Sequence, residues 1–257
     1  MHIGRLFISQ GCIVMGLLLL HVPGFSQNSQ VLLRSVIHTS PPYIDYWSYD
    51  AAGRPVGIVS TTRDSSSVIM FYQFKRDKQY ILRSTEVMDV SRNIIYSFEY
   101  HYNKARQIDY IEKFSDMDYD GKADDLDHKF SFTYDSLGRV AGMRIVKGYT
   151  VARLFSFTWQ GGNIIKVENT DGELNYWMNI SYDHSANMLE PIKWEYLTTT
   201  GTLEFYVTMF SSNNIISATL YPAAMDSVPI NIRPEYYDDG MYKTNYAEGV
   251  EYEYLYK

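Results

Sequence analysis

A short turn motif recurs along this chain. It reads YDAAGR at residues 49–54 and YDSLGR at 134–139, with a weaker copy, YDHSAN, at 182–187. An aspartate at the first corner of a type I turn accepts hydrogen bonds from backbone N–H groups, and a glycine three residues later accommodates a positive φ. The first two copies are therefore predicted to be hairpin turns between antiparallel strands. The predicted turns are Asp50–Gly53 and Asp135–Gly138, with Tyr49, Tyr134 and Tyr182 at the ends of the strands that lead into the three copies.

Other segments lack the complete motif but keep the same order of strand, turn and strand. The units start 23 to 32 residues apart. That spacing accommodates two strands of about seven to nine residues and two short loops, so each unit is one hairpin. The units begin at Tyr49, Phe74, Tyr102, Tyr134, Trp159, Tyr182 and Met209.

Apolar and polar residues alternate within these units, as they do in strands with one buried face. In IIYSFEYHY, at 94–102, the residues at even positions are an isoleucine and four aromatic residues. Seven hairpins give about fourteen strands, and a twisted sheet of that size curls or closes. We therefore predict an all-β fold, an antiparallel meander of repeated hairpins rolled into a barrel-like or strongly curved sheet. Three prolines and the turn YYDDG predict an irregular crossing loop at 218–249, before a last strand near Val250–Tyr256 that pairs with an early strand.

The motif Y-D-x-x-G-R followed by an apolar residue resembles the YD repeats of Rhs-type bacterial proteins, whose hairpins coil into large hollow shells. The copies at 49–54 and 134–139 match it, whereas Ala186 and Asn187 replace the glycine and arginine of the third copy. Over roughly 40–257, the chain also resembles an uncharacterised family of secreted proteins from Gram-negative gut and oral bacteria that have a porin-like β fold. The resemblance implies a fold and brings no known activity with it.

The first 26 residues have the layout of a cleavable signal peptide. A positive start, MHIGR, precedes an apolar run from Leu6 to Leu20, which is shorter than the roughly 20 residues of a membrane-spanning helix. We therefore predict cleavage after Ser26, export to the periplasm, the cell surface or the medium, and one β-repeat domain at 27–257. Cys12 precedes most of the apolar run, so we do not expect a lipid anchor.

The predicted mature chain contains no cysteine, so a packed core must stabilise it without disulfides. The 23 basic residues of the whole chain include Arg5 in the signal peptide, which leaves 22 against 30 acidic residues and a net charge of −8. Proteins bind nucleic acid largely by neutralising phosphates with lysine and arginine. The charge therefore argues against nucleic acid as a partner.

An acidic segment, SDMDYDGKADDLDHKF at 115–130, follows the spacing of a twelve-residue calcium loop. Two alternatives remain open for it, a calcium site and a solvated acidic turn. An aspartate replaces the usual glutamate at the last ligand position, and the flanking segments look like strands. However, adjacent carboxylates about 4 Å apart repel by about 1 kcal/mol even in water, which favours a bound cation. The predicted calcium ligands are Asp116, Asp118, Asp120, Asp124 and Asp127, with the carbonyl oxygen of Lys122.

Sequence signatures of enzymes are missing from the mature chain. It has no H-E-x-x-H, no G-x-S-x-G and no phosphate-binding glycine loop. Its 24 tyrosines and four tryptophans are the kind of residue that stacks on sugar rings, although aromatic residues also pair across strands. We predict a secreted, non-enzymatic binding or structural module with YD-like repeats, not embedded in a membrane, with a glycan or another cell-envelope component as the partner class.

Two alternatives are a secreted glycan-binding or glycan-hydrolysing protein and an outer-membrane β-barrel. A deep pocket with two carboxylates and several aromatic residues would favour hydrolysis. The direction of the Phe98, Phe132 and Phe157 side chains tests the outer-membrane alternative. Rings that point outward would face lipid and favour it, whereas rings that point inward would belong to a core.

Overall fold

The computed structural model describes most of the chain after residue 30. The described residues are 31–39, 42–148, 150–170, 175–187, 189–197, 210–223, 226–230, 234–236, 238, 242–245 and 250–256. The predicted signal peptide and Met209 lie outside them. No helix among the described residues is long and apolar enough to cross a membrane.

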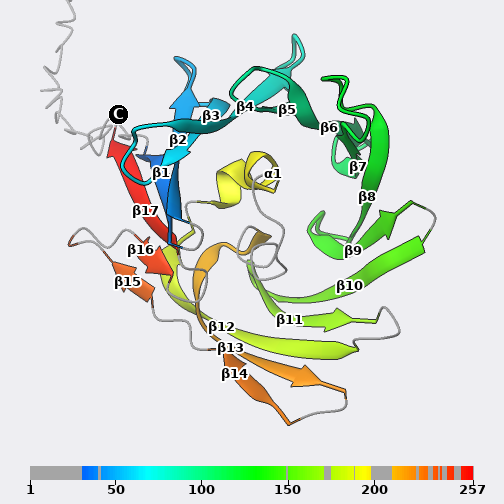
Figure 1. Cartoon of the computed structure of the whole chain (residues 1–257). Coiled ribbons are helices and arrows are strands. Elements are labelled where there is room, and N and C mark those ends of the chain that lie inside the picture. The colour runs from blue at the N-terminus through cyan, green and yellow to red at the C-terminus, as the bar shows by residue number, and fades with distance from the viewer. Residues whose placement is uncertain are drawn as a thin grey trace, which may run out of the picture.

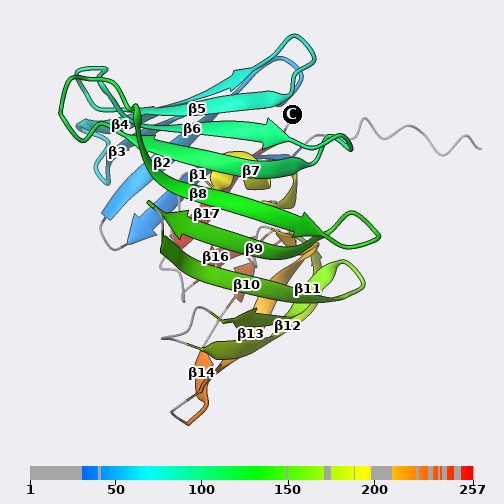
Figure 2. The same ribbon diagram turned by 90° about the vertical axis from the view of Figure 1, so that its right-hand side faces the viewer.

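Within the described ranges, seventeen strands form one curved antiparallel sheet (Figure 1). Consecutive strands lie side by side along its wall, as Figure 2 shows. The strands are β1 (Val31–Thr39), β2 (Pro42–Tyr49), β3 (Pro55–Thr62), β4 (Val68–Arg76), β5 (Leu82–Met88), β6 (Ile94–Tyr102), β7 (Ile108–Ser115), β8 (Asp125–Tyr134), β9 (Val140–Lys147), β10 (Thr150–Gln160), β11 (Asn163–Asn169), β12 (Tyr176–Ala186), β13 (Asn213–Pro222), β14 (Val228–Ile230), β15 (Pro234–Tyr236), β16 (Tyr242–Asn245) and β17 (Val250–Tyr256).

The pairing follows the order of the chain, as a meander requires. Each strand from β1 to β13 pairs with the next one. The last strand, β17, pairs with β1, which confirms the predicted return to an early strand, and β16 joins it to β15. Among the described residues, no pairing joins β14 to β15. The sheet is therefore strongly curved and left open at one seam, and the predicted curved meander is confirmed.

The prediction of an irregular crossing loop at 218–249 is partly wrong. It contains the end of β13 and the short strands β14, β15 and β16, of three, three and four residues. The other strands have seven residues or more and number fourteen, as predicted. Proline is tolerated at strand ends and on edge strands. Pro222 ends β13, Pro234 begins β15, and Pro229 lies in β14, which borders the open seam.

A short helical segment lies inside the curve of the sheet (Figure 1). It consists of a 3-10 turn, η1 (Glu190–Ile192), and α1 (Lys193–Tyr196). Tyr196 stacks on Trp47 of β2 with the ring centres 5.8 Å apart, and Trp194 meets Phe132 of β8 edge-on at 5.1 Å. The helix is therefore part of the core.

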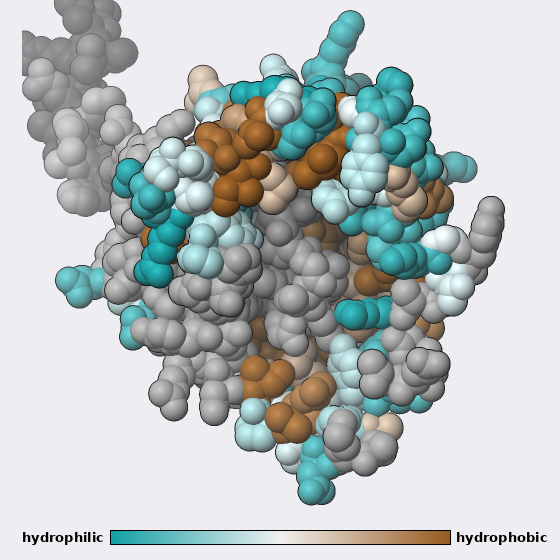
Figure 3. Space-filling view, viewed as in Figure 1, coloured by the Kyte–Doolittle hydropathy of each residue, from teal (hydrophilic) through white to brown (hydrophobic). Residues whose placement is uncertain are grey.

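The rest of the core comes from the inner face of the strands. Phe98, Phe132 and Phe157 belong to it and point inward. Hydrophobic residues gather toward the inside of the ring and hydrophilic residues lie along its periphery (Figure 3). Other buried residues of the core are Ile58, Phe74, Val87, Ile111, Met143, Phe155, Ile164, Val167 and Met178.

Both predicted turns form with the expected chemistry. In the first, Asp50 accepts hydrogen bonds from the backbone N–H of Ala52 at 2.9 Å and of Arg54 at 3.0 Å, and Gly53 has φ 77°. The arginine of the motif folds back on the aspartate, with Nε 2.7 Å from Oδ2. These hydrogen bonds, first the one from the Arg54 side chain, lower the pKa of Asp50.

The second turn repeats this geometry. Asp135 accepts from the backbone N–H of Leu137 and of Arg139, both at 2.9 Å, and Gly138 has φ 78°. Arg139 Nε lies 2.8 Å from Asp135 Oδ2. The two aspartate charges are therefore neutralised within their own turns.

Three further turns use the same design without glycine. Each starts with an aspartate or asparagine that accepts from the backbone N–H two and four residues later. The residue at the positive-φ position is Tyr80 (φ 62°), Arg92 (φ 70°) or Arg106 (φ 62°). The first residues of these turns are Asp77, Asp89 and Asn103.

The aromatic residue that begins each predicted unit ties its strand to the neighbouring strand. Its side chain donates a hydrogen bond to a backbone carbonyl at or near the beginning of the preceding strand, and burial raises the pKa of the tyrosines above the ordinary value. Phe74 has no polar atom and cannot do this. The bonds are Tyr49 to Leu33 (2.6 Å), Tyr102 to Leu82 (2.7 Å), Tyr134 to Ile108 (2.6 Å), Trp159 to Val140 (2.8 Å) and Tyr182 to Ile164 (2.6 Å).

The third copy of the motif departs from the prediction. Tyr182 lies inside β12 and not at its end, because the strand continues to Ala186. Without the glycine and arginine, no tight turn forms there. Asp183 accepts instead from the backbone N–H of Ser185 at 3.0 Å and of Asn214 at 3.1 Å.

Candidate functional site

The acidic loop between β7 and β8 brings the first three predicted calcium ligands together. One carboxylate oxygen from each of Asp116, Asp118 and Asp120 lies within 4.8 Å of the other two. Gly121 follows with φ 86°, the sharp turn that its position in the motif requires. The side chains at positions 1, 3 and 5 of the motif therefore lie close together, and calcium binding by them stays a prediction.

Backbone N–H groups hold this half of the loop in place. Asp116 accepts from the N–H of Asp120 and of Gly121, both at 3.0 Å. Lys122 donates to Asp120 through its ammonium group at 2.6 Å and through its N–H at 2.9 Å. The bond from the Lys122 side chain is the main reason why the pKa of Asp120 is lowered.

The last two predicted carboxylates lie elsewhere. Asp124 is exposed at the end of the loop. Asp127 lies in β8, where Lys113 Nζ is 2.9 Å and His128 Nδ1 is 3.0 Å from its carboxylate. Burial raises the pKa of Asp127, but these two partners outweigh it and the pKa is lowered. Because β8 starts at Asp125, the chain leaves the loop along the sheet and does not return to the first three aspartates.

A cavity of about 410 Å³ opens at the end of the sheet where the motif turns lie. Rings form much of its wall. The hydroxyl groups of Tyr102 and Tyr134 and the indole N–H of Trp159 donate hydrogen bonds to backbone carbonyls, so these residues contribute mainly ring surface to the cavity. The aromatic residues in its lining are Tyr102, Tyr134, Trp159, Trp194 and Phe210, and the charged residues are Arg106, Arg139, Glu190 and Lys193.

The charged groups of this turn-end cavity are mostly paired. Glu190 is the only carboxylate among its described lining residues, and Lys193 Nζ lies 2.5 Å from it. Arg139 is held by Asp135 and donates to the carbonyl of Gly161 at 2.7 Å. The cavity thus combines aromatic surface with polar groups at fixed positions and lacks a second carboxylate among these residues.

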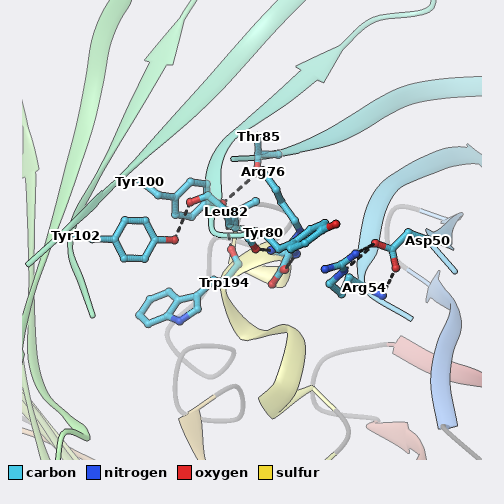
Figure 4. A network of polar contacts seen from close by, with 10 residues as sticks. Asp50, Arg54, Arg76, Tyr80, Leu82, Thr85, Tyr100, Tyr102 and Trp194 are labelled. Atoms are coloured by element: carbon cyan, nitrogen blue, oxygen red, sulfur yellow. Dashed lines mark hydrogen bonds and ion pairs between the residues drawn. The ribbon is translucent and has the colours of Figure 1, made fainter. Parts of the chain in front are cut away.

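A network of polar contacts fixes the inner helix beside the cavity (Figure 4). Tyr100 donates to the carbonyl of Trp194 at 3.1 Å and lies 3.0 Å from the hydroxyl of Thr85. Arg76 pairs with Glu195 of α1. These contacts position Trp194 against the wall of the sheet, so the ring is preorganised.

The same network reaches the first motif turn. Arg76 donates to the carbonyl of Tyr80 at 3.3 Å, and the guanidinium of Arg54 lies 3.7 Å from the centre of the Tyr80 ring. A second cavity of about 410 Å³ lies next to this turn, and Glu195 is the only carboxylate among its described lining residues.

Comparison with known proteins shows the fold. No family model and no curated protein matches the chain. It is similar to the crystal structure of a porin-like protein from Bacteroides uniformis, with 11% sequence identity, a TM-score of 0.54, and coverage of 88% of this chain and 97% of the other. The expected porin-like β fold is therefore confirmed.

A weaker similarity is to the crystal structure of TcdB2-TccC3-TEV. It has 13% identity and a TM-score of 0.34, and covers 79% of this chain but 12% of that one. A similarity at this level does not establish a shared fold.

Proposed function

We propose that the protein is an exported, non-enzymatic binding module, built from hairpins similar to YD repeats, that binds a glycan of the cell envelope or its surroundings in the turn-end cavity. The observation that carries this proposal is the set of rings in the cavity wall. Binding sites are typically concave and aromatic, with a few polar groups that fix the orientation of the ligand. The paired Arg139, Glu190 and Lys193 supply such groups.

The cavity favours binding over hydrolysis. Glycoside hydrolysis uses two carboxyl groups on either side of the scissile bond. In the described lining, Glu190 is the single carboxylate and is engaged by Lys193.

The outer face of the sheet argues against the outer-membrane alternative. Lys75 and Glu86 form an ion pair and alternate along their strands with buried Phe74 and Val87, so they project outward. Charged side chains on a lipid-facing surface are costly. Together with the inward direction of Phe98, they support a surface in contact with water.

We also propose that the acidic loop holds a structural calcium ion. Three converging carboxylates with a single lysine beside them support this. The ligand set is smaller than the sequence predicted, since Asp127 lies in β8 and is engaged by Lys113 of β7. The remaining positions would be filled by water and backbone oxygens, which implies weak binding of the kind found in extracellular modules.

A glycan array tests the binding proposal with two matched tryptophan variants. Trp194→Leu removes a cavity ring, whereas Trp177→Leu removes an outward-facing tryptophan that is 40% exposed and stacks on Tyr221. We expect glycans retained by the wild type to bind about fivefold more weakly to Trp194→Leu, because a ring contact contributes about 1 kcal/mol. Equal binding by both folded variants, or no retained glycan at all, would contradict the proposal.

A further inference from the structure

The outer face of β6 and β7 carries a second group of potential metal ligands. Residues two apart in a strand project from the same face, which places Glu99 and His101 together. The strand register sets Glu112 of β7 directly opposite Glu99. One ligand atom from each of the three side chains lies within 4.8 Å of the other two.

The spacing of these atoms is close to that of a zinc site. His101 Nε2 lies 3.2 Å from a carboxylate oxygen of Glu112 and 3.9 Å from one of Glu99. Bonds of about 2.0–2.2 Å in a tetrahedral zinc site place ligand atoms about 3.3–3.6 Å apart. Small side-chain rotations would therefore bring all three atoms onto one ion.

The imidazole nitrogen of the group is poorly satisfied without a ligand. His101 Nε2 is covered from solvent and makes no hydrogen bond of normal geometry, despite its nearness to Glu112. Like charges directly opposite each other across a strand pair are unfavourable, which applies to Glu99 and Glu112. A bound cation would relieve both conditions, since it takes the His101 nitrogen and adds to the one positive charge that Lys129 places beside Glu112.

Neighbouring side chains orient the three ligands. Tyr110, opposite His101 in the register, stacks on the imidazole with the ring centres 4.2 Å apart. Lys129 of β8 donates to Glu112 Oε1 at 3.0 Å and leaves Oε2 facing the histidine. Groups that hold metal ligands in position in this way raise the affinity of the site.

We propose that Glu99, His101 and Glu112 form a binding site for zinc or a similar divalent transition metal ion. An imidazole with two carboxylates suits these ions, whereas the all-oxygen set of the acidic loop suits calcium. The side chain of Glu99 is 55% exposed, so the ion has access from solvent and water can complete its coordination.

Calorimetric titration of the untagged protein with zinc chloride tests this site. We expect one zinc ion per chain, and a loss of affinity of at least about tenfold in His101→Gln and in Glu99→Gln. His128→Gln is the matched control, because that histidine pairs with Asp127 away from the group. Asp116→Asn/Asp120→Asn should bind zinc as the wild type does, which separates this site from the acidic loop.

A second readout is the visible spectrum after cobalt is bound in place of zinc. A tetrahedral or five-coordinate site gives absorption bands that His101→Gln should lose while it keeps the wild-type circular dichroism. The proposal is overturned if millimolar zinc produces no binding heat, or if folded His101→Gln binds zinc as tightly as His128→Gln does.

Discussion

The motif turns and the acidic loop both begin with an aspartate that accepts hydrogen bonds from the N–H groups that follow it. They differ in charge, because the aspartate of a motif turn is paired with an arginine whereas most carboxylates of the acidic loop are not paired with a basic side chain among the described residues. In the motif turn, Arg139 lies on Asp135 through two nitrogen atoms, at 2.8 and 2.6 Å. In the acidic loop, three carboxylates converge and Lys122 engages one of them. A turn that neutralises itself is complete as it stands, whereas a loop with surplus negative charge is stabilised by a cation.

Replacing the glycine of a motif turn should produce the largest effect. Gly138 has φ 78°, and a Cβ there would lie 3.1 Å from Gln107 Nε2. Gly138→Val should therefore destabilise the protein by about 2 kcal/mol and lower its melting temperature by about 4–8 °C. Leu137→Val, a change at an exposed residue of the same turn, is the control. Equal melting temperatures for the two variants would mean that the turn does not depend on its glycine.

Calcium should distinguish the acidic loop from the motif turns. With a dissociation constant of about 0.1 mM, about 1 mM calcium should raise the melting temperature by about 3–6 °C relative to chelator. Asp116→Asn/Asp120→Asn should lose this response, and Asp135→Asn should keep it. The calcium proposal fails if chelator leaves the wild-type melting temperature unchanged and titration shows no binding heat.

Acid should act on the motif turns. Backbone and side-chain hydrogen bonds from Arg139 lower the pKa of Asp135, and the turn at Asp50 behaves in the same way. A carboxyl whose pKa is lower in the folded than in the unfolded state contributes its full stability above the unfolded value, near 3.9, and loses it as the pH falls through the folded value. Urea unfolding below about pH 4 should therefore show a shallower loss of stability in Asp50→Asn/Asp135→Asn than in the wild type. Parallel curves for the two proteins would refute this.

Removing the lysine of the acidic loop should give the smallest effect. Lys122 Nζ lies 2.6 Å from Asp120 Oδ2 and competes with any cation there. An exposed ion pair contributes about 0.2–1 kcal/mol, so Lys122→Ala should tighten calcium binding by about 1.5- to 5-fold in a calorimetric titration. Weaker binding would show that the lysine supports the site instead.

The repeat could be predicted from the sequence because its causes are local. Asp50 and Gly53 lie in one turn, and alternating apolar residues specify which face of a strand is buried. The turns at Tyr80 and Arg106 have no glycine, and the sequence indicated them only through the units that begin at Phe74 and Tyr102. The turn at Arg92 was not assigned, and its signal was the aspartate three residues earlier.

The inner helix, the position of Asp127 and the second group of metal ligands could not be predicted, because they depend on contacts between segments that are distant in the sequence. The helix α1, with four residues, is too short to show a period, and its pairing with Arg76 joins positions far apart in the chain. The calcium template assumes a helix after the loop, so Asp127 was expected near Asp116 although a strand carries it away. The pairing of Glu99 with Glu112 follows from a strand register that single-strand patterns do not reveal.

The hydrogen bond from each leading tyrosine or tryptophan reaches back to the preceding strand, so each of these strand pairs carries its own closing bond, and only the pair that ends at Phe74 lacks one among the described units. Duplication of one hairpin would add a turn, its closing bond and its share of the wall, and would leave the bonds inside the other hairpins unchanged. The circumference of such a ring is then set by the number of copies. Gene duplication or deletion of whole units gives evolution a direct route to wider or narrower rings with the same local chemistry.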